Sequence, residues 1–140
     1  MSDKYFLDTD IFIYSFDLAN PRKAQIAEEL VTRGVGSKAA VISYQVVQEF
    51  INVSLRRFKA PITVAELEIY FSKVLLPMMT ITSSSGLFLE ALRLQGANQL
   101  SWCDSLIVTA AIQGGCKVLY SEDLQHRRQF GNLVIQNPFL

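Results

Sequence analysis

The sequence predicts an α/β/α sandwich with a mostly parallel central sheet, built by one domain over residues 1–140. Short apolar segments alternate with helical patterns along the whole chain, which is typical of a parallel sheet covered by helices. Of all residues, 50% are hydrophobic and the mean hydropathy is +0.24, as expected for a sheet buried on both faces. A chain of this length buries roughly two-thirds of its unfolded surface, so one core suffices.

The first half of the chain predicts two strands and two long helices. Asn20 followed by Pro21 is typical of a helix start, and Gly34 is typical of a helix end. Ser43 can cap the next helix, in which Glu49 occupies the second turn. The expected elements are a strand over 4–8, helical turns over 11–16, a helix over 21–34, a strand over 39–42 and a helix over 43–55.

The second half continues the alternation. Thr63 and Glu66 have the spacing of a capping box, which predicts a helix to about Lys73. Residues 75–81 predict a strand, weakened by Pro77. The remaining expected elements are a helix over 83–96, a helix over 102–113 capped by Ser101 and stopped by Gly114, and strands over 118–120 and 133–135.

Four acidic residues lie where the chain passes between strands and helices: Asp8, Glu49, Asp104 and Asp123. The carboxyl ends of parallel strands meet at one edge of a sheet, where ligands bind. Carboxylates about 5 Å apart repel by roughly 3 kcal/mol per pair at an effective dielectric near 20, so converging acids need a cation. Oxygen ligands without a His or Cys cluster indicate Mg²⁺ or Mn²⁺ rather than zinc.

Each acid also has a structural interpretation. Asp104 in the first turn of a helix suits the helix dipole and can pair with Ser101. Glu49 alone is typical of a solvated helix position, and Asp123 of an ordinary turn. Asp8 is harder to explain this way, because it interrupts an apolar junction where a charge is costly without a partner.

The charge balance argues weakly against nucleic acid as a partner. Lys and Arg total 13, as do Asp and Glu, so the net charge is zero and the pI is about 6.6. If four acids gather in one cleft, however, the rest of the surface is basic. The candidate basic clusters are residues 56–59 and 126–128, each of which is also typical of a solvated helix end.

We expect a cytoplasmic protein that does not enter the membrane. Its apolar runs are far shorter than the ~20 residues of a membrane span, and the N-terminus lacks the layout of a signal peptide. Cys103 and Cys116 lack CxxC spacing and lie in or just after an apolar helical stretch, so we interpret them as small buried side chains.

The segments around these acids resemble a known family, the PIN-domain ribonucleases, and among them the VapC-like toxins of type II toxin–antitoxin systems. Residues 6–14 resemble the family's opening Leu-Asp-Thr-Asn segment, except that Asp10 stands where Asn is commonest. Residues 47–50 resemble its helical Glu motif, and residues 102–111 its Asp-initiated helix. Residues 119–124 resemble its closing Thr/Ser-x-Asp motif, and residues 137–139 a common C-terminal ending.

The resemblance implies a single PIN-like domain acting as a metal-dependent endoribonuclease. Asp8, Asp104 and Asp123 would hold one or two Mg²⁺ or Mn²⁺ ions, and Glu49 would complete the cage. The metal would activate water, so the lone His126 is not needed as a base. Residues that would orient ligands are Thr9, Asp10 and Ser121. Candidate RNA contacts are Tyr14, Phe16, Arg56 and Arg57, although the aromatic residues also suit a core.

The resemblance also implies partners. VapC-like proteins are usually homodimers whose cleft is occupied by an antitoxin peptide, often through an Arg or Lys. Such a basic side chain would make charge-assisted hydrogen bonds with the acids and compete with metal.

Two alternatives remain open. Asp8 and Asp10 after a strand also fit a haloacid-dehalogenase-like phosphatase, with Asp8 as nucleophile and Asp10 as general acid and base. Against this, Ile11 is bulky where a small residue is usual, and no cap domain fits in 140 residues. The other alternative is a catalytically inactive binding module on a PIN scaffold, which the fold alone does not exclude.

Overall fold

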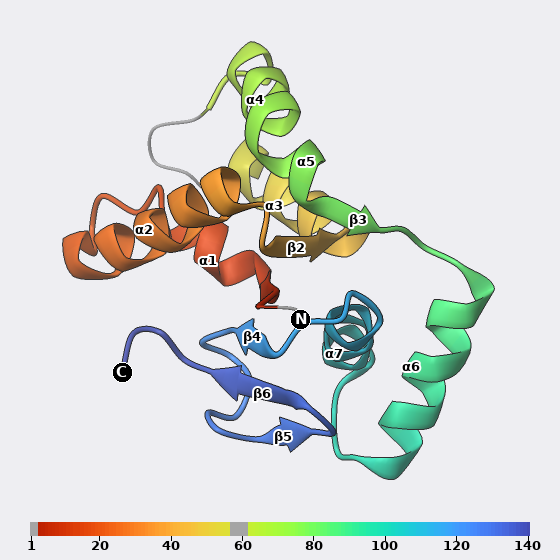
Figure 1. Ribbon diagram of the computed structural model, residues 1–140. Coiled ribbons are helices and arrows are strands. Elements are labelled where there is room, and N and C mark those ends of the chain that lie inside the picture. Colours follow the sequence, from red (N-terminus) through yellow and green to blue (C-terminus); the bar gives the residue numbers. More distant parts are fainter. Residues whose placement is uncertain (1–2, 57–61) are drawn as a thin grey trace.

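The computed structural model describes residues 3–56 and 62–140, and its strands form one sheet in the order β3-β2-β1-β4-β6-β5 (Figure 1). All neighbours are parallel except β5 and β6. The strands are β1 (Tyr5–Leu7), β2 (Ala40–Ser43), β3 (Met79–Ile81), β4 (Val118–Tyr120), β5 (Gln129–Phe130) and β6 (Leu133–Gln136). The predicted α/β fold with a mostly parallel sheet is confirmed.

Helices cover both faces of this sheet. They are α1 (Thr9–Tyr14), α2 (Pro21–Ser37), α3 (Tyr44–Arg56), α4 (Val64–Tyr70), the π-helical η1 (Phe71–Leu75), α5 (Leu76–Met78), α6 (Ser85–Ala97) and α7 (Trp102–Gln113). Parallel crossovers are almost always right-handed. The connections through α2 and α3 lead toward β3, and those through α6 and α7 lead back to β4, so the two sets pack on opposite faces (Figure 1).

The central strands are buried on both faces. Phe6 and Leu7 of β1, Ile42 of β2 and Leu119 of β4 are inaccessible to solvent. This explains why the strands are continuous apolar runs rather than alternating patterns. A rigid apolar centre therefore supports the polar residues that follow each strand.

Helix α2 runs three residues beyond the predicted end at Gly34 and closes at Lys38, which has a left-handed backbone. A Cβ atom at Gly34 would lie 2.5 Å from the Cβ of Ala40. Gly34 therefore allows α2 to approach β2 closely and does not end the helix. Asn20 does not cap α2 with its side chain, which donates to Asp17 instead.

The strand predicted over 75–81 is wrong for its first half. The helical chain continues through η1 and α5 to Met78, and only Met79–Ile81 is extended. Pro77 lies in α5 directly after the π-helical η1, so the N–H that proline lacks falls where the regular α-helical hydrogen-bond ladder is already interrupted. The short antiparallel β5 was also not predicted, because two residues carry no readable periodicity.

The strand order reverses between β1 and β4. From β1 the chain builds outward through β2 to β3, whereas from β4 it builds the other way to β6. Such a reversal leaves a crevice at the carboxyl ends of the two central strands, and ligands of open α/β sheets bind there. Asp8 directly follows β1, and Ser121 directly follows β4.

Candidate metal-binding nuclease site

Asp8 is fixed by hydrogen bonds from both central strand ends. It caps α1, and its Oδ1 accepts from the Thr9 backbone N–H at 2.7 Å. Its Oδ2 accepts from the hydroxyl of Ser121 at 2.8 Å, and Ser121 is fully buried. Asp8 itself is only 8% exposed. The carboxylate is therefore held in one orientation at the switch point of the sheet.

Asp10 points toward the loop that follows β4. Its Oδ2 accepts from the backbone N–H groups of Glu122 at 3.0 Å and of Asp123 at 3.4 Å. Its Oδ1 is buried and has no hydrogen-bond partner within the part of the chain that the structure describes. A buried carboxylate oxygen without a donor is costly, so this atom is a ready acceptor for a bound cation.

Glu49 and Asp104 approach from helices on the two faces of the sheet. Glu49 lies in α3, and its Oε1 accepts from the Thr9 hydroxyl at 2.8 Å. Asp104 lies in the first turn of α7, where its backbone N–H donates to Ser101 Oγ at 3.1 Å. Gln45 of α3 donates to the Cys103 carbonyl at 3.2 Å and so links the two helix starts.

The predicted acids line one cavity of about 310 Å³. The acids lie at different depths, because Asp123 is exposed to solvent and Asp8 is buried. Gln45, Asn52 and Cys103 were not predicted as neighbours of the acids, because a single residue on a helix does not indicate which side of the helix it occupies. The lining residues are Asp8, Thr9, Asp10, Ile13, Gln45, Glu49, Asn52, Val53, Cys103, Asp104, Ile107 and Asp123.

The acids repel one another in this cavity. Burial raises the pKa of Asp8, and the charges of Glu49 and Asp104 add to the increase, against the lowering effect of its two hydrogen bonds. Burial also raises the pKa of Asp10, reinforced by the charges of Asp8 and Asp123. The carboxylates are therefore close enough to interact electrostatically, and a cation among them would relieve the repulsion.

The donor set fits a hard divalent ion. The acids offer only oxygen atoms, one of which is the unpartnered Oδ1 of Asp10. Within residues 3–56 and 62–140, the His, Cys, Asp and Glu side chains form no complete group of three around a single ion position. An ion bound here would need water molecules as further ligands, as Mg²⁺ usually retains.

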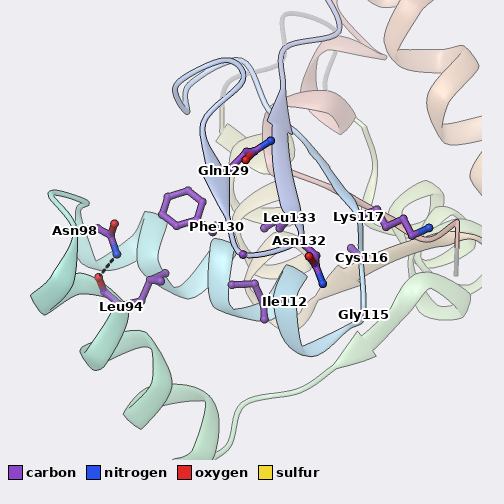
Figure 2. Close-up of a pocket in the computed structure, with 11 residues that line it drawn as sticks. Leu94, Asn98, Ile112, Gly115, Cys116, Lys117, Gln129, Phe130, Asn132 and Leu133 are labelled. Carbon is purple, nitrogen blue, oxygen red and sulfur yellow. Dashed lines mark hydrogen bonds between the residues drawn. The ribbon is translucent and has the colours of Figure 1, made fainter.

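Three other cavities, with volumes of about 450, 640 and 690 Å³, are larger, but converging acids line none of them. The one drawn in Figure 2 has a volume of about 640 Å³ and lies between α6, α7 and the start of β6. Lys117 is the one charged residue in its lining, and the amide of Asn98 is occupied by the Leu94 carbonyl at 2.9 Å (Figure 2). The cavity of about 690 Å³ is mostly apolar. The converging acids, not the volume, identify the candidate site.

The basic clusters occupy different places. Arg56 is exposed at the end of α3, whereas residues 57–59 of the same predicted cluster lie outside the described residues, Arg57 among them. In the second cluster, Arg128 stacks over the ring of Phe130 at 4.7 Å and donates to Asn98. His126 accepts the Asn137 backbone N–H through Nδ1. Residues 126 and 128 therefore have structural contacts away from the acids.

Cys103 does not fit the prediction of two buried thiols. Cys103 is exposed and lines the acidic cavity, whereas Cys116 is buried. The reason is the position of Cys103 in the first turn of α7, before that helix enters the core. Burial raises the pKa of the Cys116 thiol to about 12, as predicted for a side chain that serves packing.

The fold is that of a recognised protein class. Residues 5–130 match the PIN domain, and the chain belongs to this family. This assignment favours the nuclease interpretation over the haloacid-dehalogenase-like one. None of the curated proteins matches the chain in sequence.

Solved structures of toxin–antitoxin proteins share the fold. VapBC2 from Rickettsia felis, bound to a promoter DNA fragment, has a TM-score of 0.66 at 19% identity and covers 95% of this chain and 97% of its own. VapC20 from Mycobacterium tuberculosis, a toxin that cleaves the sarcin-ricin loop, has a TM-score of 0.62 at 20% identity. The match covers 86% of this chain and 90% of VapC20. FitAcB from Neisseria gonorrhoeae has a TM-score of 0.63 at 12% identity, and the match covers 96% of this chain and 98% of the FitAcB chain.

No helix in the described part of the chain is both long and apolar enough to cross a membrane.

Proposed function

We propose that this protein is a Mg²⁺- or Mn²⁺-dependent endoribonuclease and the toxin of a toxin–antitoxin pair. The observation that carries the proposal is the convergence of five carboxylates on one cavity at the switch point of the sheet, where a buried Asp10 oxygen has no hydrogen-bond partner among the described residues. Membership in the PIN family supports it, since PIN nucleases generally use divalent metals.

The proposed roles follow from the hydrogen bonds. Asp8, Glu49, Asp104 and Asp123 hold the ion, directly or through water. When bound, the ion lowers the pKa of a water molecule and stabilises charge on the phosphate. Ser121 keeps Asp8 in position, and the Thr9 hydroxyl keeps Glu49 in position. Asp10 anchors the loop that carries Asp123 through Oδ2, and its Oδ1 would accept from a water molecule held by the ion.

RNA is the proposed substrate. Glu49, Asn52 and Arg56 recur at helical spacing along α3, so Asn52 in the cavity lining lies between a cleft acid and an exposed cation. Such a cation can hold a phosphate beside the cleft. The RNA-cleaving activity of VapC20 supports this substrate class. Tyr14 and Phe16 are less suited to base stacking, because Tyr14 contacts Phe139, and Phe16 contacts Phe50 and Tyr70.

The test is RNA cleavage by the purified protein. We expect cleavage of a structured RNA with Mg²⁺ or Mn²⁺, none in excess EDTA, and recovery when the metal is restored. Asp8→Asn should be inactive. Undiminished cleavage in EDTA would rule out the metal mechanism, and a wild type that neither cleaves RNA nor binds Mn²⁺ would favour the inactive binding module.

An antitoxin helix is the proposed occupant of the apolar cavity of about 690 Å³. The two cavities share the segment around the end of α1, since Ile13 lines the acidic cavity while Ser15 and Phe16, directly after α1, line the apolar one. An amphipathic helix seated there could extend a basic side chain to the acids. Its lining residues are Ser15, Phe16, Glu28, Val31, Thr32, Val35, Gly36, Tyr70 and Val74.

Co-expression tests this partner. Expression of the wild type should arrest bacterial growth, and the small protein encoded beside it should relieve the arrest. Val35→Glu places a charge in the apolar cavity and should prevent relief while leaving RNA cleavage intact. If expression of the Asp8→Asn variant still arrested bacterial growth, the toxin proposal would be contradicted.

A homodimer is also proposed, and the exposed side of α6 supports it. Phe88, Leu89 and Leu92 are 42%, 54% and 55% exposed, and Trp102 packs edge-on against Phe88. Neighbouring apolar residues of this size mark an interaction surface. Light scattering should give a dimer for the wild type and a monomer for Leu92→Glu. A monomeric wild type would contradict the proposal.

A further inference from the structure

A four-residue cluster includes the chain neighbour of Asp123 but shares no lining residue with the acidic cavity. Its members come from α1, α2, the loop after β4 and the C-terminal segment: Tyr14, Lys23, Glu122 and Phe139. We call this cluster the Glu122 clamp. The metal and RNA chemistry proposed above assigns it no role.

Glu122 is bound through both carboxylate oxygens. Oε1 accepts from the Tyr14 hydroxyl at 2.5 Å, and Oε2 forms an ion pair with Lys23 Nζ at 2.6 Å. The Lys23 and Glu122 side chains are only 30% and 25% exposed, so water screens this pair less than a fully exposed one. Although burial favours the neutral acid, these contacts lower the pKa of Glu122.

Aromatic rings complete the clamp. Lys23 Nζ lies 4.7 Å from the Tyr14 ring centroid and 5.6 Å from that of Phe139. The two rings meet edge to face at 5.0 Å. The Phe139 carbonyl accepts from Arg22, so the C-terminal segment is tied to α2 as well. The Lys23 ammonium is thereby directed at Glu122 by groups on several elements.

The backbone of Glu122 connects the clamp to the cleft. Its N–H and that of Asp123 are the two donors to Asp10 Oδ2, and Asp123 extends from the same loop to the cavity. These N–H groups reach Asp10 only while the loop keeps this conformation. The side chain of Glu122, held by Tyr14 and Lys23, is a second anchor of this loop beside Asp10.

We propose that Tyr14, Lys23 and Glu122 are positioning residues that set the divalent-metal affinity of the cleft by fixing the loop that carries Asp123. The proposal rests on the proposed metal-dependent function. Groups that orient metal ligands without touching the ion typically change its affinity by about 10–100-fold when removed.

Lys23→Met is the decisive variant. Methionine keeps much of the length and packing of the lysine stem against the two rings but removes the ion pair. Isothermal titration with Mn²⁺ alone, without RNA, should give a dissociation constant roughly tenfold higher than wild type. Lys23→Arg should keep the constant near the wild-type value, since guanidinium also pairs with carboxylate.

Arg93→Met is the matched control. It removes the exposed Arg93–Glu90 ion pair on α6, none of whose residues lines the acidic cavity, and should not change Mn²⁺ affinity. Half-saturating Mn²⁺ for RNA cleavage should rise in Lys23→Met, with the rate at saturating Mn²⁺ preserved. Wild-type Mn²⁺ affinity in a folded Lys23→Met protein would overturn the proposal. Absence of Mn²⁺ binding and RNA cleavage in the wild type would instead overturn the function on which it rests.

Discussion

Asp10 and Glu122 are connected because the Glu122 backbone N–H donates to Asp10 Oδ2, yet the environments of their carboxylates are opposite. Burial favours the neutral form of each. For Glu122, Lys23 and Tyr14 outweigh burial and lower the pKa, whereas for Asp10 the charges of Asp8 and Asp123 add to burial and raise the pKa. Both Glu122 carboxylate oxygens have partners, one of them the Lys23 ammonium, whereas the charges that act on Asp10 are negative.

This difference separates structural acids from functional ones. A carboxylate that serves the fold has cationic and hydroxyl partners within the chain, as Glu122 has. The cleft acids instead interact mainly with each other and with neutral donors, an arrangement that destabilises the protein unless something positive binds. Perturbed ionisation of this kind is concentrated at functional sites, where stability is commonly lower than it could be.

The largest expected effect is loss of cleavage in Asp104→Asn. If Asp104 is a metal ligand, the substitution should reduce RNA cleavage by at least about 100-fold while keeping or raising the melting temperature in EDTA. The matched control is Glu90→Gln, which removes an exposed carboxylate on α6 and should retain activity. A protein that is less stable but fully active would show that Asp104 only serves the start of α7.

Asp10→Asn should have a much smaller effect on cleavage. An Asn oxygen can still accept a backbone N–H from Glu122 or Asp123, so the loop should stay in place. We expect metal-dependent RNA cleavage within about tenfold of wild type, whereas a general acid of a phosphatase would contribute roughly 10²–10⁴-fold.

The control for this variant is Asp8→Asn, which should be inactive. Both proteins and the wild type should be assayed on RNA and on a small phosphate monoester. Monoester hydrolysis by a wild type that never cuts RNA, lost in both variants, would move the assignment to the phosphatase.

The local features of the fold were predicted well from the sequence. Asp8 follows a strand, Ser101 caps α7, and Thr63 and Glu66 form both hydrogen bonds of their capping box. Each of these depends on residues a few positions apart, so propensity and spacing suffice to predict it. Which acids act as metal ligands stays a prediction.

Long-range contacts were not predictable in this way. Glu122 looked like one more polar residue between Ser121 and Asp123, because its partners Tyr14 and Lys23 are 108 and 99 positions away. The π-helical turn before Pro77 and the exposure of Cys103 likewise depend on how helices pack, which a single sequence does not encode locally.

The smallest expected effect, on stability, tests the comparison most directly. Without metal, Asp10→Asn removes a repelled charge and should raise the melting temperature by about 2–5 °C, whereas Glu122→Gln weakens the clamp and should lower it by about as much. Circular dichroism melts in EDTA measure both. Shifts of the same sign in the two variants would contradict the contrast between the two acids.

The pH dependence of these shifts should also differ. A raised pKa means that folded Asp10 binds its proton more tightly than the unfolded chain does, so its charge costs stability increasingly as pH rises above the unfolded pKa. The increase in melting temperature that Asp10→Asn causes should therefore grow from about pH 5 to about pH 8. Glu122 has a lowered pKa, so its contribution is already present above its unfolded pKa, and the deficit of Glu122→Gln should change little over this interval. An Asp10→Asn advantage that does not change with pH would show that Asp10 is not under electrostatic strain in the metal-free fold.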